Sequence, residues 1–168
     1  MSDAPSRKGG KTSNRRRVMV QNHGVSNSDT ATSGNFGVVT GWAHPVSVGG
    51  SEQAHILPIP YGTHSGPYYA RAHWWQPAAG TGLVTFQFGL ASMSDLDSGV
   101  LTNTTTDVAD SCAVIDTYHV TAWTAALTVT NTEAPGDVLI LTVGRDETAD
   151  AGSIDILAIG FEVEYTGV

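Results

Sequence analysis

The stretch that most constrains the fold is residues 136–165, GDVLILTVGRDETADAGSIDILAIGFEVEY. Residues 138–143 are rich in β-branched side chains and apolar on both faces, as in a strand buried on both sides. Residues 161–165 alternate apolar with charged side chains, which indicates one face on a core and one in water. A polar loop at 145–153 separates these two runs. We therefore predict a long hairpin that closes an all-β domain.

Other segments also show a strand period. In residues 68–76 the even-numbered side chains share one face and the odd-numbered ones the other. The next strand is predicted to turn Val84, Phe86 and Phe88 inward. Two prolines within residues 54–60 indicate an edge strand or an extended crossing. The strands predicted before the hairpin cover residues 36–42, 54–60, 68–76 and 83–90, with a long strand or bent pair at 118–130.

These signals indicate a single all-β domain. The 168 residues include 19 glycines and show no helical period and no internal repeat, which argues against a propeller or solenoid. Around eight short strands separated by polar turns are typical of a two-sheet sandwich. We predict a single jelly roll, or another two-sheet antiparallel sandwich, at residues 36–168. A basic extended N-terminal arm and linker is predicted to precede it at residues 1–35.

Charge divides the chain unevenly. Its net charge is −8, yet residues 1–17 carry six basic groups and one acid, whereas the remaining 151 residues carry two basic groups and fifteen acids. A basic tail on an acidic body usually binds an anionic partner, although it can also be a disordered, solubilising terminus. The arm is predicted to clamp a neighbouring subunit by charge and then add a strand to its sheet. The predicted partner-binding residues are Arg7, Lys8, Lys11, Arg15, Arg16 and Arg17, followed by the docking strand Val18, Met19 and Val20.

The single cysteine, Cys112, cannot form an internal disulfide and is compatible with assembly in a reducing cytoplasm. No apolar run reaches the roughly 18 residues of a membrane helix. The N-terminus lacks the apolar centre of a secretory signal. We expect a soluble protein that does not contact a membrane.

No motif indicates catalysis. The sequence has no Gly-x-Ser-x-Gly elbow and no phosphate-binding loop, so we predict no catalytic residue, no cofactor and no enzymatic activity. A metal site would need His55, His64 and His73 to converge, or the acidic loops 92–99 and 106–111 to gather around calcium. Histidines and loop aspartates more often bond their own surroundings, and we predict no metal site.

Four aromatic residues in one strand admit two interpretations. Tyr68, Tyr69, Trp74 and Trp75 can stack sugar rings on a surface, or fill the core and a subunit interface. The core and interface interpretation is favoured because aromatic side chains usually bury their area. The glycan surface stays open as the alternative.

Short motifs spread over residues 54–166 resemble small jelly-roll virion proteins of tailed bacteriophages, most closely in the last thirty residues. The resemblance covers structural positions and not catalytic ones. The motifs are Trp75-x-Pro77, Leu83-Val84, Ser94-Asp95-Leu96, Gly136-Asp137, Leu139, Leu141, Val143, Arg145-Asp146, Ala151-Gly152, Ile156-Leu157 and Glu162-Val163-Glu164-Tyr165.

The resemblance implies a virion protein, made in the host cytoplasm, that assembles as a trimer or another symmetric ring. Its expected partners are its own copies and the major capsid protein or another virion protein. The leading expectation is a capsid decoration protein that cements the shell through its arm. One alternative is a tail, neck or head-fibre appendage that binds a glycan or receptor. Another is a small capsid protein whose arm binds packaged nucleic acid, which the acidic body disfavours.

Overall fold

The computed structural model describes residues 14–21, 32–36, 39–44, 53–94, 104–112, 114–146, 149, 151–152 and 154–168. These residues form strands, and they contain no helix long and apolar enough to cross a membrane. The strands are β1 (Arg15–Gln21), β2 (Thr32–Phe36), β3 (Val39–His44), β4 (Gln53–Leu57), β5 (His64–Gln76), β6 (Leu83–Met93), β7 (Thr106–Ser111), β8 (Thr117–Val120), β9 (Val129–Thr130), β10 (Val138–Arg145) and β11 (Ile156–Gly167).

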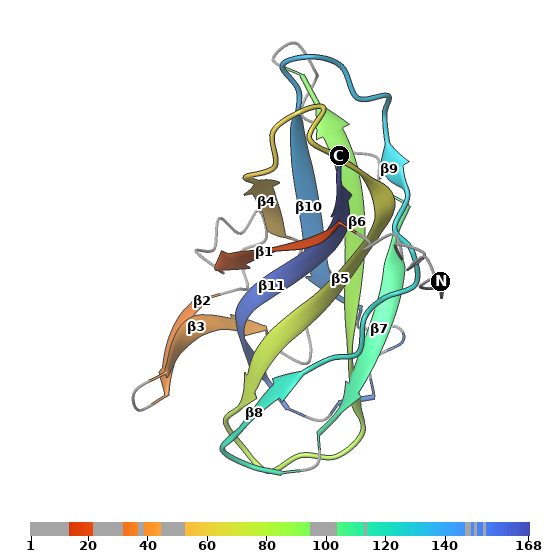
Figure 1. Ribbon diagram of the computed structural model, residues 1–168. Helices are drawn as coiled ribbons and strands as arrows, with labels where there is room; N and C mark the ends of the chain where they lie inside the picture. Colours follow the sequence, from red (N-terminus) through yellow and green to blue (C-terminus); the bar gives the residue numbers. More distant parts are fainter. Residues whose placement is uncertain are drawn as a thin grey trace, which may run out of the picture.

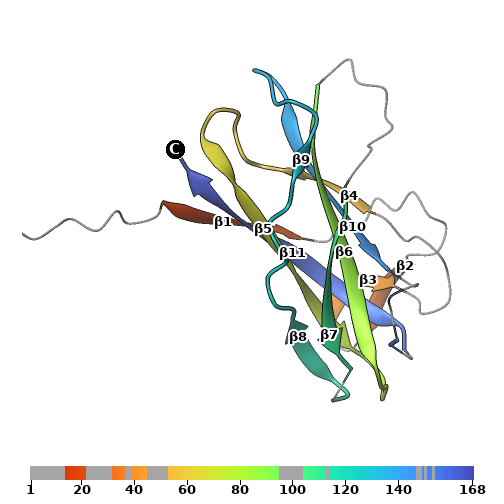
Figure 2. The same cartoon turned by 90° about the vertical axis from the view of Figure 1, so that its right-hand side faces the viewer.

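The strands form two sheets (Figure 1). The six-stranded sheet has the order β2-β3-β11-β5-β8, and β1 also pairs with β11. The five-stranded sheet has the order β4-β10-β6-β7, with β9 beside β6. Every pairing is antiparallel except the short parallel contact of β9 with β6. Figure 2 shows β5 and β11 in one layer and β6 and β10 in the other. The predicted all-β, two-sheet architecture is confirmed.

The predicted hairpin at residues 136–165 is wrong. β10 pairs with β4 and β6, whereas β11 lies in the other sheet between β5 on one edge and β3 and β1 on the other. The loop between them therefore crosses from one sheet to the other. Alternation of side chains identifies the face that a strand buries, but a core between two sheets receives such faces from both. The side-chain pattern of residues 136–165 was therefore compatible with two strands that pair with each other and with two strands in different sheets.

The core lies between the sheets where the sequence places it. Residues 68–76 of β5 show the two predicted faces, and the structure places the even-numbered side chains in the core while most odd-numbered ones stay partly exposed. The inward set predicted on β6 is fully buried, and β4 is an edge strand. The largest fully buried apolar side chains are Trp74, Phe86, Phe88, Phe161, Leu90, Leu139, Leu141, Ile156 and Leu157.

Residues 118–130 form a bent pair of short strands instead of one long strand. β8 ends at Val120, and the chain then continues beside β5 as far as β9 without forming a regular strand. The N–H groups of Thr121 and Thr124 donate to the carbonyls of Ala72 and Ala70, at 3.0 and 2.8 Å. The hydroxyls of the two threonines accept hydrogen bonds from the backbone N–H groups of the same two alanines. This segment carries Trp123 beside β5.

Candidate functional site

β1 is an edge strand on the chain's own β11. Its register runs from Arg15 opposite Thr166 to Gln21 opposite Gly160. Side chains alternate across the strand, so that Val18 and Val20 pack against the core cluster while Arg15 and Arg17 lie on the outer face. The strand that the sequence predicts around Val18 is therefore present, and here it pairs within one chain.

Two arginines of β1 hold one carboxylate of β11. Arg15 Nη1 lies 2.8 Å from Glu164 Oε1, and Arg17 Nε lies 2.9 Å from Glu164 Oε2. The Glu164 side chain is 6% exposed, whereas those of Arg15 and Arg17 are 60% and 54% exposed. A buried carboxylate needs such partners, because an unpaired charge in this position loses its hydration without compensation. β1 thus covers and neutralises an acid of the sheet.

A second carboxylate continues the network on the same face. Two guanidinium nitrogens of Arg71, on β5, lie 2.7 and 2.5 Å from Glu162 Oε2. His73 Nε2 lies 3.4 Å from the same oxygen, and its Nδ1 contacts the Tyr118 hydroxyl. Burial lowers the pKa of His73, while the hydrogen bond to Glu162 opposes that shift. The charged face therefore joins β5, β8 and β11.

Trp123 lies under two of these cations. The guanidinium carbons of Arg71 and Arg17 are 4.4 and 5.2 Å from the centre of the Trp123 ring. Both distances fall within the range of cation–π attraction, which contributes about 0.5–1 kcal/mol at exposed positions. Trp123 therefore connects β1 to β5 across β11.

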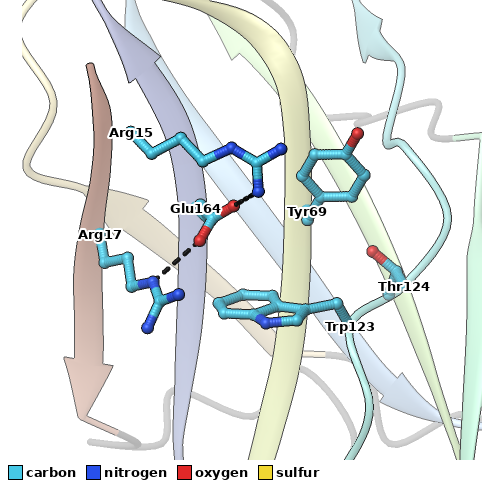
Figure 3. Close-up of a pocket in the computed structure, with 6 residues that line it drawn as sticks. All are labelled: Arg15, Arg17, Tyr69, Trp123, Thr124 and Glu164. Atoms are coloured by element: carbon cyan, nitrogen blue, oxygen red, sulfur yellow. Dashed lines mark hydrogen bonds and ion pairs between the residues drawn. The ribbon is translucent and has the colours of Figure 1, made fainter. Parts of the chain in front are cut away.

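A hollow of about 200 Å³ opens between these groups (Figure 3). β1 supplies two arginines, β11 a carboxylate, β5 a tyrosine, and the segment after β8 a tryptophan and a threonine. We call it the arginine hollow. Its lining residues are Arg15, Arg17, Tyr69, Trp123, Thr124 and Glu164.

The structure separates the residues that the sequence proposed for partner binding. Arg7, Lys8 and Lys11 lie outside the described residues. Arg16 lies on the opposite face of β1 from the hollow, where its side chain packs so close to Gly167 that a Cβ atom there would clash with it. Met19, also in the predicted docking strand, is 52% exposed.

The four proposed aromatic residues also divide. Tyr68 and Trp74 belong to the core, at 6% and 0% exposure. Tyr69 and Trp75 are partly exposed, and only Tyr69 lines the hollow. Trp123 was missed by sequence reasoning because it stands alone in a stretch of threonines and alanines. Its proximity to β1 depends on how residues 121–128 run along β5.

The histidines have separate partners. The Nδ1 atom of buried His64 lies 2.7 Å from the Tyr68 hydroxyl, a hydrogen-bond distance. Its Nε2 atom lies 3.0 Å from Glu133 Oε1, which is close enough for an ion pair but lacks hydrogen-bond geometry. Burial, with Glu133 nearby, raises the pKa of Tyr68 to about 12. His119 stacks on Trp74 with ring centres 4.1 Å apart.

Within the described ranges, no three His, Cys, Asp or Glu side chains gather as metal ligands would. Both metal sites considered from the sequence, at the three histidines and at the acidic loops, required such a gathering. Of the acidic loops considered for calcium, Asp95 and Asp97 lie outside the described residues.

Comparisons with models of known protein families, with curated proteins and with solved structures found no match. The function must therefore be argued from the fold and from the contacts of β1.

Proposed function

We propose that this protein is a non-enzymatic structural component of a virion, a jelly-roll decoration protein that cements a tailed-phage capsid as a trimer or a similar closed ring. The contact of β1 with β11 carries the proposal. It combines a full antiparallel ladder with ion pairs to Glu164, and it uses the N-terminal strand of the chain. Such a strand can serve a neighbouring copy as well as its own.

The order of strand pairing supports the jelly-roll part of the proposal. Apart from β1, β2 and β9, eight strands remain among the described residues. The first pairs with the last (β3 with β11), the second with the seventh (β4 with β10), the third with the sixth (β5 with β8) and the fourth with the fifth (β6 with β7). This is the order expected when one long antiparallel hairpin is rolled into two sheets, as in a jelly roll.

The chemistry of β1 supports exchange between copies. An identical neighbour presents the same β11 edge, with Glu162 and Glu164 at the same positions, so the contacts made within one chain can form between two. Exchange therefore loses little contact energy, and its extent depends on local concentration and on the linking segment. On a shell, where copies are held close together, exchanged strands tie neighbours without covalent links.

Truncation tests this proposal. Removing residues 1–20 deletes β1 together with the basic residues before it, whereas removing residues 1–13 is the matched control that retains β1. We expect both variants to fold by circular dichroism and only the longer truncation to lose co-sedimentation with capsids stripped of this protein. Unchanged particle binding by the longer truncation contradicts the proposal.

The arginine hollow favours a second candidate, an appendage that binds a glycan or receptor. It offers partly exposed Tyr69 and Trp123 beside cationic groups. The nucleic-acid alternative gains less support, because Arg15, Arg17 and Arg71 face Glu162 and Glu164, which leaves an excess of only one positive charge for a polyanion. A salt titration with nucleic acid tests that alternative, since phosphate binding weakens steeply as salt rises.

A further inference from the structure

The accessible positive charge of the described residues gathers at one place. Their basic side chains other than histidine are five arginines. Arg145 is 2% exposed and donates to the carbonyls of Ile154 and Gly152, so it is not available to a ligand. Of the other four, Arg15, Arg17 and Arg71 surround Trp123 or line the arginine hollow. Within the described part of the chain, this placement offers an anion one favourable site.

The guanidinium groups at the hollow retain capacity for a ligand. Each guanidinium has five N–H donors, and Glu164 takes a single nitrogen from Arg15 and from Arg17. Both side chains are more than half exposed, so their remaining donors reach solvent. Counting Arg71 and Glu162, three guanidiniums face two carboxylates, which leaves an excess of one positive charge. A single negative group completes the pairing.

Aromatic walls and a small volume restrict the rest of the ligand. Figure 3 shows Tyr69 and Trp123 bordering the hollow on the side away from β1. Aromatic faces pack against flat, partly apolar rings such as the C–H faces of sugars. The volume of about 200 Å³ lies below the roughly 300–1,000 Å³ of pockets for drug-sized ligands. It therefore suits one ring.

We propose that the arginine hollow binds one carboxylate-bearing sugar residue, such as a uronic acid. The carboxylate pairs with Arg15 and Arg17, and the ring packs on Tyr69 and Trp123. The Thr124 hydroxyl accepts a hydrogen bond from Ala70 N–H and donates its own proton to a ring hydroxyl. This binding site goes beyond capsid decoration. It requires β1 to be paired with β11, and β1 can come from the same chain or from a neighbouring copy. Bound ligand then stabilises the docked strand by mass action.

Titration of the purified chain with glucuronate tests the site, and calorimetry and saturation-transfer NMR measure the binding. Glucose and acetate are the matched probes, since each supplies half of the proposed ligand, and inorganic phosphate reports a site for any anion. We expect saturable glucuronate binding, with each half-ligand at least about tenfold weaker. Equal binding of acetate or phosphate indicates a plain anion site, and equal binding of glucose indicates stacking alone. Either result, or no glucuronate binding, overturns the proposal.

Variants locate the binding. Arg17→Gln should weaken glucuronate binding about tenfold, whereas Arg16→Gln, the same change on the opposite face of β1, should leave it unaltered. Tyr69→Ser removes one wall and keeps both guanidiniums, so it separates loss of the ligand from displacement of β1. Equal affinities for all three variants contradict the assignment. These measurements need no particles, so they succeed or fail independently of the decoration role.

Discussion

β11 has two long antiparallel neighbours, and they are held in different ways. β5 pairs with residues 157–167 of β11 and brings Ala70, Ala72 and Trp74, all fully buried, into the core. β1 pairs with residues 160–166 and contributes only partly buried valines to the core. Its outer face holds exposed arginines on Glu164. One contact is therefore dominated by apolar burial, and the other by a backbone ladder with ion pairs.

This difference separates permanent from reversible structure. Burial of a large apolar side chain contributes about 1.5–3 kcal/mol and is not weakened by salt. Ion pairs with one exposed partner, such as Arg15 and Arg17 here, contribute about 1 kcal/mol each and are weakened by salt. A strand held in the second way can leave its edge while the body stays folded. β1 therefore suits exchange between copies, and β5 does not.

The largest effect is expected from Trp74→Ala on β5. Removing this fully buried ring also removes its hydrogen bond to Asp110, and we expect a loss of about 3–5 kcal/mol in the free energy of unfolding. Val18→Ala on β1 is the comparison, with an expected loss of about 1 kcal/mol or less because Val18 is only partly buried. Urea denaturation measures both. Similar losses would break the distinction between the two neighbours of β11.

A smaller and more local effect is expected from Glu164→Gln. The amide keeps the shape of the side chain but removes the charge that Arg15 and Arg17 share, so β1 should detach more often. Hydrogen–deuterium exchange of residues 16–20 should speed up several-fold, while amides of residues 70–74 keep their protection. Added salt should speed exchange of β1 in the natural protein and have less effect in the variant. Salt-independent protection of β1 in both proteins argues against an ionic contribution.

The smallest effect concerns His73, which joins β5 to Glu162 of β11. Burial lowers its pKa below the usual 6.5, so between these two values the unfolded chain binds more protons than the folded one. The contribution of His73 to stability is therefore complete above pH 6.5 and declines as the pH falls through its folded pKa. His73→Gln should remove this dependence. Denaturation midpoints of both proteins between roughly pH 7.5 and pH 5, the titration range of histidine, measure the difference. Parallel curves contradict the assignment.

Sequence periodicity predicted local structure well and partners poorly. The alternation in residues 68–76 divided the side chains of β5 correctly into two faces, but it did not say which face meets the core. The proline-containing segment was predicted as an edge strand or an extended crossing, and the first of these is confirmed. The same reasoning joined β10 to β11, which lie in different sheets, since a pattern of faces does not specify a neighbour.

The candidate site shows the same division. The sequence by itself determined an all-β chain with a basic N-terminal segment ahead of an acidic body, because charge and side-chain period are properties of the chain alone. Only the tertiary structure decided that Arg15 and Arg17 meet Glu164 and that Trp123 lies beside them. These residues are far apart in sequence and meet because β1 pairs with β11 and residues 121–128 follow β5. Long-range pairing of this kind is set by the fit of whole strands, which no single segment encodes.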